Sequence, residues 1–192
     1  MLRALYNKTL SLAGHRHAVP ILALIAFIES SIFPIPPDVL LIPIILARPH
    51  QAFRIALICT LASVAGGAVG YAIGALLFDS LGQPVLAFYG MEVKFDTFRT
   101  AYNDYGAWAV LFAGITPFPY KVITILSGAT GLSFGVFMVA SIIARALRFF
   151  IVAALLWKYG TPVKDFIERR LGLVFTLAVI ALIGGFLAVK LL

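Results

Sequence analysis

Two stretches of the chain, FPIPPDVLLIPI at Phe33–Ile44 and TPFPYKVITILS at Thr116–Ser127, interrupt apolar runs with prolines in the same way. Proline removes a backbone N–H donor and disfavours helix in the residue before it, so each stretch should break a helix. When the stretches are aligned without a gap, the acid Asp38 falls opposite the base Lys121. The prolines at the two breaks are Pro34, Pro36, Pro37, Pro117 and Pro119.

The composition is that of a membrane protein. Of the 192 residues 62% are hydrophobic and 12% are charged, whereas soluble domains are about half apolar and about a quarter charged. The net charge of +7 does not indicate nucleic acid, because the bases are scattered over short loops without a basic face. The one cysteine, Cys59, has no partner for an internal disulfide or a C-x-x-C metal site.

Two apolar runs, 52–78 and 134–159, are long enough to cross a membrane as helices, since a span needs about 20 residues. The runs beside each proline break are shorter. We therefore expect two re-entrant hairpins, at about 18–47 and 106–132, which enter the bilayer and return to the same side. The predicted fold is an all-α integral membrane protein, an inverted repeat in which each hairpin precedes one crossing helix.

Three further segments flank or connect the halves of this repeat. The mixed apolar and basic residues of 1–17 predict an amphipathic helix on the membrane surface. The polar segment 79–103 predicts an extramembrane region with a short surface helix. Residues 161–192 are expected to form a basic loop and a C-terminal transmembrane helix, which leaves 18–160 as the transport core.

The basic residues predict the orientation in the membrane. If each hairpin returns to its starting side, nine of the 15 lysines and arginines lie on the side of the N-terminus, three on the opposite side and three at membrane depth. Cytoplasmic loops are enriched in Lys and Arg. The N-terminus is therefore expected in the cytoplasm.

Five ionisable side chains at membrane depth are the candidate functional residues, because charges at that depth are costly and usually serve a function. They are Glu29, Asp38, Lys121, Arg145 and Arg148. The alternative is that they pair only to hold the two halves together, since a buried pair adds little stability but fixes register.

The two acids are candidate proton-coupling residues. Glu29 lies in an otherwise apolar run, where a carboxyl group favours its protonated form unless a base neutralises it, so it would load and release a proton. Asp38 directly follows Pro37 at the start of a half-helix, where a helix N-cap is the alternative explanation.

The three bases are candidate substrate-binding residues. Lys121 opposes the dipole at the start of its half-helix, so an anionic ligand or Asp38 would explain it. Arg145 and Arg148 lie on one helical face and present several donors to a phosphate. The alternative is that one pairs with Glu29 while the other reaches the membrane surface. Two acids neutralise only two bases, and the remaining cation favours an anionic lipid phosphate as substrate.

Other patterns indicate packing rather than chemistry. Gly66, Gly70 and Gly74 form a stripe of small residues that allows close helix contact. His15 and His17 are spaced at i and i+2, which rarely brings two ligands to one metal. No nucleophile–base arrangement is visible. We therefore expect no enzymatic activity, no metal and no cofactor.

The motif order resembles a known family. Glu29 followed by F-P-I-P-P-D, a Gly-rich crossing helix and then G-I-T-P-F-P-Y-K-V-I-T-I-L-S-G-A-T-G is similar to the DedA superfamily of SNARE-associated or VTT-domain proteins, and most of all to its YqaA-like branch. The resemblance covers about residues 18–160. It implies two re-entrant hairpins that face each other, lipid movement across the bilayer of a bacterial inner membrane, and functional acids at Glu29 and Asp38.

The sequence departs from the family at the second break. Arginines that the resemblance leads us to expect are replaced by Gly114 and Tyr120. Lys121, Arg145 and Arg148 are the candidates to substitute for them. This departure leaves the identity of the transported lipid open.

The expected function is that of a flippase or scramblase for an anionic lipid such as undecaprenyl phosphate or a phospholipid. The expected partners are membrane lipids and protons, and proton coupling and homo-oligomerisation are left open. Two alternatives share the same charges: a proton-coupled small-molecule exporter and a non-catalytic membrane assembly or scaffold protein. An enzyme acting on lipid phosphates lacks a histidine or acid cluster for phosphoryl transfer.

Overall fold

The computed structural model describes residues 17–32, 36–116 and 118–169. Within these ranges the chain consists of helices and short connections, without strands. The predicted surface helix, apart from His17, and the predicted C-terminal span lie outside the described residues, as do Pro34 and Pro117.

The helices fall into two halves. The first half contains α2 (Ala18–Ser31), α3 (Asp38–Ala47), the 3-10 turn η1 (Pro49–Gln51) and α4 (Ala52–Leu77). A π-helical turn, η2 (Phe78–Gly82), and α5 (Gln83–Tyr89) connect the halves. The second half contains α6 (Glu92–Ile115), α7 (Tyr120–Ala129) and α8 (Phe134–Arg169).

The helix ends confirm that the proline stretches act as breaks. In the first half α2 ends at Ser31 and α3 begins directly after Pro37. In the second half α6 ends at Ile115 and α7 begins directly after Pro119. We call the connection between α2 and α3 the first break and the connection between α6 and α7 the second break.

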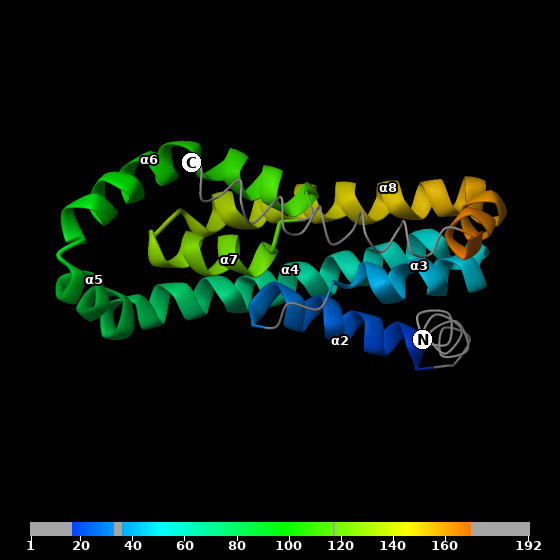
Figure 1. Cartoon of the computed structure of the whole chain (residues 1–192), viewed down its shortest axis with the longest axis horizontal. Coiled ribbons are helices and arrows are strands. Elements are labelled where there is room, and N and C mark those ends of the chain that lie inside the picture. The colour runs from blue at the N-terminus through cyan, green and yellow to red at the C-terminus, as the bar shows by residue number, and fades with distance from the viewer. Residues whose placement is uncertain (1–16, 33–35, 117, 170–192) are drawn as a thin grey trace.

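The two halves enter the molecule from opposite ends (Figure 1). Helices α4 and α8 run antiparallel along its length. The α2–α3 pair starts at one end and turns back near the middle, and the α6–α7 pair does the same from the other end. The two pairs therefore run in opposite directions along the molecule.

The packing follows the same symmetry. Helix α2 packs on α4 and α6 packs on α8, so the first arm of each pair lies on the long helix of its own half. Helix α3 packs on α8 and α7 packs on α4, so the second arm lies on the long helix of the other half. Because each second arm packs on the long helix of the other half, both breaks lie near the centre of the molecule.

Glycines on α4 let both pairs come close to it. A Cβ atom built on Gly66 would lie 2.1 Å from the carbonyl oxygen of Phe27 on α2. A Cβ atom on Gly74 would lie 1.9 Å from the carbonyl oxygen of Ile125 on α7. Gly70 faces Thr124 and Ser30 in the same way. Only glycine permits these approaches, which fits the predicted packing role of the stripe.

Two helical stretches, Pro49–Tyr89 and Phe134–Gly160, are long and apolar enough to span a membrane. They contain the two predicted crossing segments. Helix α6 begins at Glu92, so part of the predicted extramembrane segment and the first arm of the second pair form one continuous helix. Helix α8 continues past the predicted end to Arg169, with a kink at Tyr159 where φ is −119° and ψ is 23°.

Candidate functional site

The most deeply buried ion pair joins α2 to α8. Arg145 donates from Nη2 to Glu29 Oε2 at 2.9 Å, and the two side chains are 1% and 11% exposed. The guanidinium group lies between the rings of Tyr120 and Phe149, with Cζ 4.7 Å from each ring centroid. We call Glu29–Arg145 the inner pair. Its arginine is enclosed by protein on all sides.

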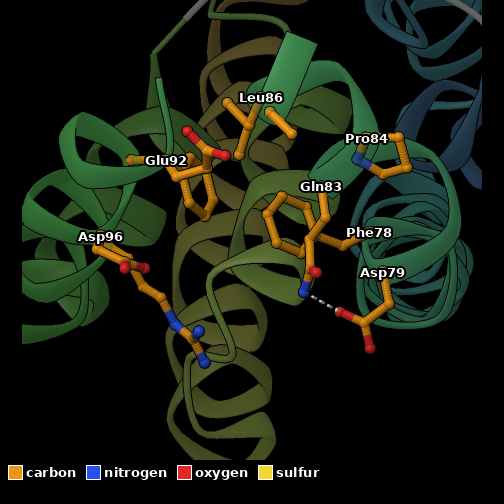
Figure 2. A pocket seen from close by; sticks show the side chains of 10 residues that line it. Phe78, Asp79, Gln83, Pro84, Leu86, Glu92 and Asp96 are labelled. Carbon is orange, nitrogen blue, oxygen red and sulfur yellow. Dashed lines mark hydrogen bonds between the residues drawn. The ribbon is translucent and has the colours of Figure 1, made fainter. Parts of the chain in front are cut away.

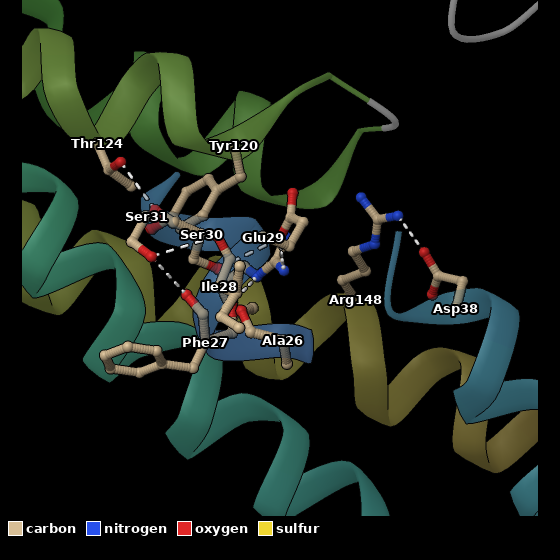
Figure 3. A network of polar contacts seen from close by, with 12 residues as sticks. Ala26, Phe27, Ile28, Glu29, Ser30, Ser31, Asp38, Tyr120, Thr124 and Arg148 are labelled. Carbon is tan, nitrogen blue, oxygen red and sulfur yellow. Dashed lines mark hydrogen bonds and ion pairs between the residues drawn. The ribbon is translucent and has the colours of Figure 1, made fainter. Parts of the chain in front are cut away.

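Two serines complete a ring of hydrogen bonds around the inner pair. Arg145 Nε donates to Ser63 Oγ of α4 at 2.6 Å. Ser63 Oγ lies 2.7 Å from Ser30 Oγ of α2, and Ser30 Oγ lies 3.2 Å from Glu29 Oε2. Figure 3 shows Glu29 and Ser30 on α2 beside Tyr120 of α7. The ring therefore connects α2, α4 and α8 at one point.

A second ion pair joins α3 to the same helix. Arg148 Nη2 is bonded to Asp38 Oδ2, and the two side chains face each other in Figure 3. Arg148 also donates from Nη1 to the carbonyl oxygen of Thr116 at 2.6 Å, which ties α3 to the end of α6. We call Asp38–Arg148 the outer pair. Its side chains are 23% and 17% exposed, so it is more accessible than the inner pair.

The two breaks also contact each other directly. Lys121, at the start of α7, donates from Nζ to the carbonyl oxygen of Ile32 at 3.1 Å. Thr124, one turn later, donates from Oγ1 to the carbonyl oxygen of Ser30 at 3.0 Å. Ile32 follows the last residue of α2, so the ammonium group of Lys121 lies at the negative end of that helix dipole.

All five predicted charges gather around the breaks, with partners that sequence alone did not fix. Asp38 is not the N-cap of α3, because Pro37 holds that position and no side chain caps the helix. Its carboxylate binds Arg148 instead, so it is not the partner of Lys121. Arg145 and Arg148 share a face of α8 yet hold different acids, so they do not form one joint phosphate clamp in this structure.

The sequence reasoning missed the hydroxyl groups that support these charges. Ser30 and Ser63 belong to the ring around the inner pair, and Thr124 links the breaks. Tyr120 stacks on the guanidinium of Arg145 and donates its hydroxyl to Ser141 Oγ at 2.5 Å. Their shared signal is a polar group within an apolar run, which is too common in membrane helices to single them out.

A pocket of about 470 Å³ lies far from the breaks, where η2, α5 and α6 meet (Figure 2). Its residues are Phe78, Asp79, Gln83, Pro84, Leu86, Ala87, Glu92, Phe95, Asp96 and Arg99. Gln83 donates to Asp79 Oδ1 at 2.8 Å, and both residues line the pocket. No group of three metal-ligating side chains occurs here or elsewhere among the described residues. The pocket is therefore a weaker candidate than the breaks.

A family model for the VTT domain matches residues 35–158, which is more than half of the chain. The chain belongs to the VTT domain family. Membership supports the resemblance to DedA and SNARE-associated proteins, and together with the two long apolar helices it identifies a membrane protein. The matched VTT range contains four of the five candidate charges, while Glu29 precedes it.

Two relatives of this VTT-domain protein cover almost its whole length. An uncharacterized protein of Haemophilus influenzae is 36% identical over 181 residues, which cover 92% of this chain and 94% of the relative. An uncharacterized protein of Histophilus somni is 34% identical over 168 residues, which cover 85% of this chain and 87% of the relative. No solved structure matches the chain.

Gly114 and Tyr120, which stand at the second break of this VTT domain where arginines were expected, both lie close to α8. A Cβ atom on Gly114 would lie 2.5 Å from Ala144 Cβ and 3.5 Å from Tyr120 Cε2, so no larger side chain fits there without a shift. The close approach of α6 to α8 at this glycine places Ala144 beside the break. Arg145 follows it directly, and its guanidinium lies on the Tyr120 ring.

Proposed function

We propose that this VTT-domain protein is a membrane lipid transporter, a flippase or scramblase, that moves an anionic lipid such as undecaprenyl phosphate or a phospholipid across the bilayer. The observation that carries this proposal is the meeting of both breaks at two acid–base pairs and one further base. Within the described part of the chain, Lys121 is bonded to a carbonyl oxygen and to no acid. The site therefore has one positive charge in excess.

The proposal includes a topology. We place both breaks inside the bilayer as re-entrant hairpins, with α4 and α8 crossing the inner membrane of a bacterium and the N-terminus in the cytoplasm. The opposite directions of the two pairs support this placement, because a substrate site between inverted repeats lies near the midplane. Within the superfamily, we assign the chain to the YqaA-like branch on its break motifs.

The lipid head group is proposed to bind at Lys121 and Arg148. An unpaired charge at the bilayer centre costs at least about 2.5–3.5 kcal/mol, so the excess cation favours an anionic ligand. Arg148 is partly exposed and held by one carboxylate, which a phosphate can replace, whereas Arg145 is enclosed. Thr116 Oγ1, beside the carbonyl that Arg148 binds, is buried and has no hydrogen-bond partner among the described residues.

Proton coupling is proposed to reside in the acids. Protonation of Glu29 would release it from Arg145 and so loosen α2 from α8. Asp38 would release Arg148 when a head group replaces its carboxylate or when a proton binds to that carboxylate. Each event frees one side of the first break, which links the protonation of the site to the movement of the hairpin. The protein itself catalyses no bond cleavage in this scheme.

The test is transport by purified protein in liposomes under an imposed pH gradient. A labelled polyprenyl phosphate and a labelled anionic phospholipid are compared with a cationic drug. Movement of either lipid, with loss of activity in Lys121→Gln and Arg148→Gln, supports the proposal, and Arg54→Gln on the exposed start of α4 serves as the control. Movement of the drug alone supports an exporter. No transport and no effect of Glu29→Gln with Asp38→Asn in cells supports a scaffold.

A further inference from the structure

The ring around the inner pair assigns a role to Ser63, a residue of α4 that belongs to neither hairpin. Arginine has only donors, so each of its hydrogen bonds in the ring has a fixed direction. Arg145 Nε donates to Ser63 Oγ, and Nη2 donates to Glu29 Oε2. The two donors on the same edge of the guanidinium group therefore bind two different residues.

The direction of the remaining bonds follows. Ser63 accepts from Arg145, and the only acceptor that the described residues offer to its own proton is Ser30 Oγ, 2.7 Å away. Ser30 then donates to the carbonyl oxygen of Ala26 at 2.9 Å or to Glu29 Oε2 at 3.2 Å. Among the described residues, both side-chain bonds to the Glu29 carboxylate reach one oxygen, Oε2.

An arginine edge that offers Nε and Nη2 normally binds both oxygens of a carboxylate, and this paired arrangement is the strong one. In this site Ser63 takes the Nε donor, so the inner pair is joined by a single arginine–carboxylate bond. We infer that Ser63 is a positioning residue that keeps the Glu29–Arg145 pair single-bonded and therefore separable by a proton. This inference rests on the proposed proton-coupling role of Glu29.

Other charged and titratable groups around the pair do not take over this role. Tyr120 of α7 and Cys59 of α4 lie near Arg145, but a phenol and a thiol are ordinarily neutral near pH 7. Arg148, one turn along α8, is bonded to Asp38 of α3. Ser63 is completely buried, and its hydroxyl oxygen accepts from the Nε donor of Arg145.

The test compares Ser63→Ala with wild type in lipid bilayers. The protonated carboxyl group of Glu29 is followed by infrared difference spectroscopy against Glu29→Gln across a pH series, without any substrate. In Ser63→Ala the freed Nε donor can bond the second carboxylate oxygen. Protonating Glu29 should then require about a tenfold higher proton concentration, a shift of the pH midpoint that corresponds to about 1.4 kcal/mol. Ser63→Thr, which keeps an acceptor oxygen, should restore the wild-type midpoint.

The matched control is Thr60→Val, because Thr60 lies one turn earlier on α4, is also buried, and bonds only the carbonyl oxygen of Ala56 in the described structure. It should leave the midpoint unchanged. Ser63→Cys has a side chain of similar size with a weak acceptor, and it should shift the midpoint in the same direction as Ser63→Ala. It tests the inference if Ser63→Ala does not fold. The inference is overturned if Glu29 has the same protonation midpoint in wild type, Ser63→Ala and Ser63→Cys, or if these two variants shift it toward higher pH.

A parallel measurement of lipid transport against pH separates this inference from the proposed function. If wild type moves neither lipid, the transport proposal fails, while the infrared midpoints still decide the role of Ser63. If wild type moves lipid and Ser63→Ala has an unchanged infrared midpoint, the role of Ser63 is excluded and the transport proposal stands. A purely structural role would lower stability in Ser63→Ala without moving either pH profile.

Discussion

The inner pair and the outer pair combine the same chemical groups one turn apart on α8, yet their surroundings differ. The inner arginine is 1% exposed and stacked between two aromatic rings, while the outer arginine is 17% exposed and bonded to a carboxylate and a backbone carbonyl. An enclosed pair excludes ligands and is costly to break. An accessible pair exchanges partners with less penalty. On this difference we propose that the inner pair serves stability and proton coupling, and that the outer pair contacts the ligand.

The largest expected effect comes from removing one partner of the inner pair. Arg145→Gln leaves the Glu29 carboxylate buried without its base, and such a loss costs about 3–5 kcal/mol. Arg148→Gln should cost much less, because Asp38 is 23% exposed and remains partly solvated. Denaturant unfolding in detergent micelles measures both variants. Equal losses would remove the distinction between the pairs.

A double variant sharpens the same contrast. Glu29→Gln with Arg145→Gln removes both charges and should recover part of the stability lost in Arg145→Gln alone, since no unpaired charge stays buried. The corresponding outer double variant, Asp38→Asn with Arg148→Gln, should show little coupling between its two changes. A double-mutant cycle gives both interaction energies, and a larger coupling in the outer pair would contradict the assignment.

The next effect concerns the proton gradient. Glu29→Gln should abolish the dependence of lipid transport on an imposed pH gradient, because it removes the acid of the enclosed pair. Asp38→Asn should lower the transport rate and keep a dependence on the gradient. Liposome transport with and without the gradient distinguishes the two variants. A Glu29→Gln protein that still accelerates with the gradient as wild type does would show that the coupling proton lies elsewhere.

Binding of the lipid head group should depend on the bases at the breaks and not on a base elsewhere. Lys121→Gln and Arg148→Gln are each expected to weaken binding of a polyprenyl phosphate by about tenfold or more, the equivalent of one charge-assisted hydrogen bond of about 1.5–3 kcal/mol. The control Arg54→Gln changes an exposed base at the start of α4 and should have little effect. Similar losses in all three variants would mean that the bases act only through net charge.

The smallest expected effect is at Thr116, whose carbonyl oxygen binds Arg148 while its own Oγ1 is buried and unpartnered among the described residues. Thr116→Val keeps the backbone contact and removes a hydroxyl that makes no bond. Stability should stay equal or rise by up to about 1 kcal/mol. If the hydroxyl contacts the head group, lipid binding weakens in this variant although the protein is no less stable.

The sequence predicted the breaks well because proline acts locally. Pro37 and Pro119 constrain their own backbone and the residue before them, so the start of α3 and of α7 could be read directly from the chain. The extent of α4 and the start of α8 followed from the apolar runs, whereas α8 continues to Arg169, past its predicted end at 159. The start of α6 did not follow from such a run, because the polar residues after Glu92 lie in the same helix as the apolar residues before Ile115.

The pairing of the charges was not predictable from spacing. Asp38 and Lys121 align in the repeat, yet Asp38 binds Arg148, because the exchange of arms packs α3 on α8. The separation of Arg145 from Arg148 depends on Tyr120 and Phe149, whose rings enclose one guanidinium group and leave the other at the edge. Such three-dimensional neighbours leave no signature in a single sequence.

The two acids flank the first break, and both of their bases stand on the part of α8 that precedes its kink at Tyr159. Helix α8 thus fixes the separation of the two ends of the break, since Arg145 and Arg148 differ by about 4.5 Å in rise along its axis. One residue inserted between them would turn Arg148 by about 100° and detach it from Asp38. The chain should accordingly tolerate substitutions in this turn of α8 far better than a change in its length.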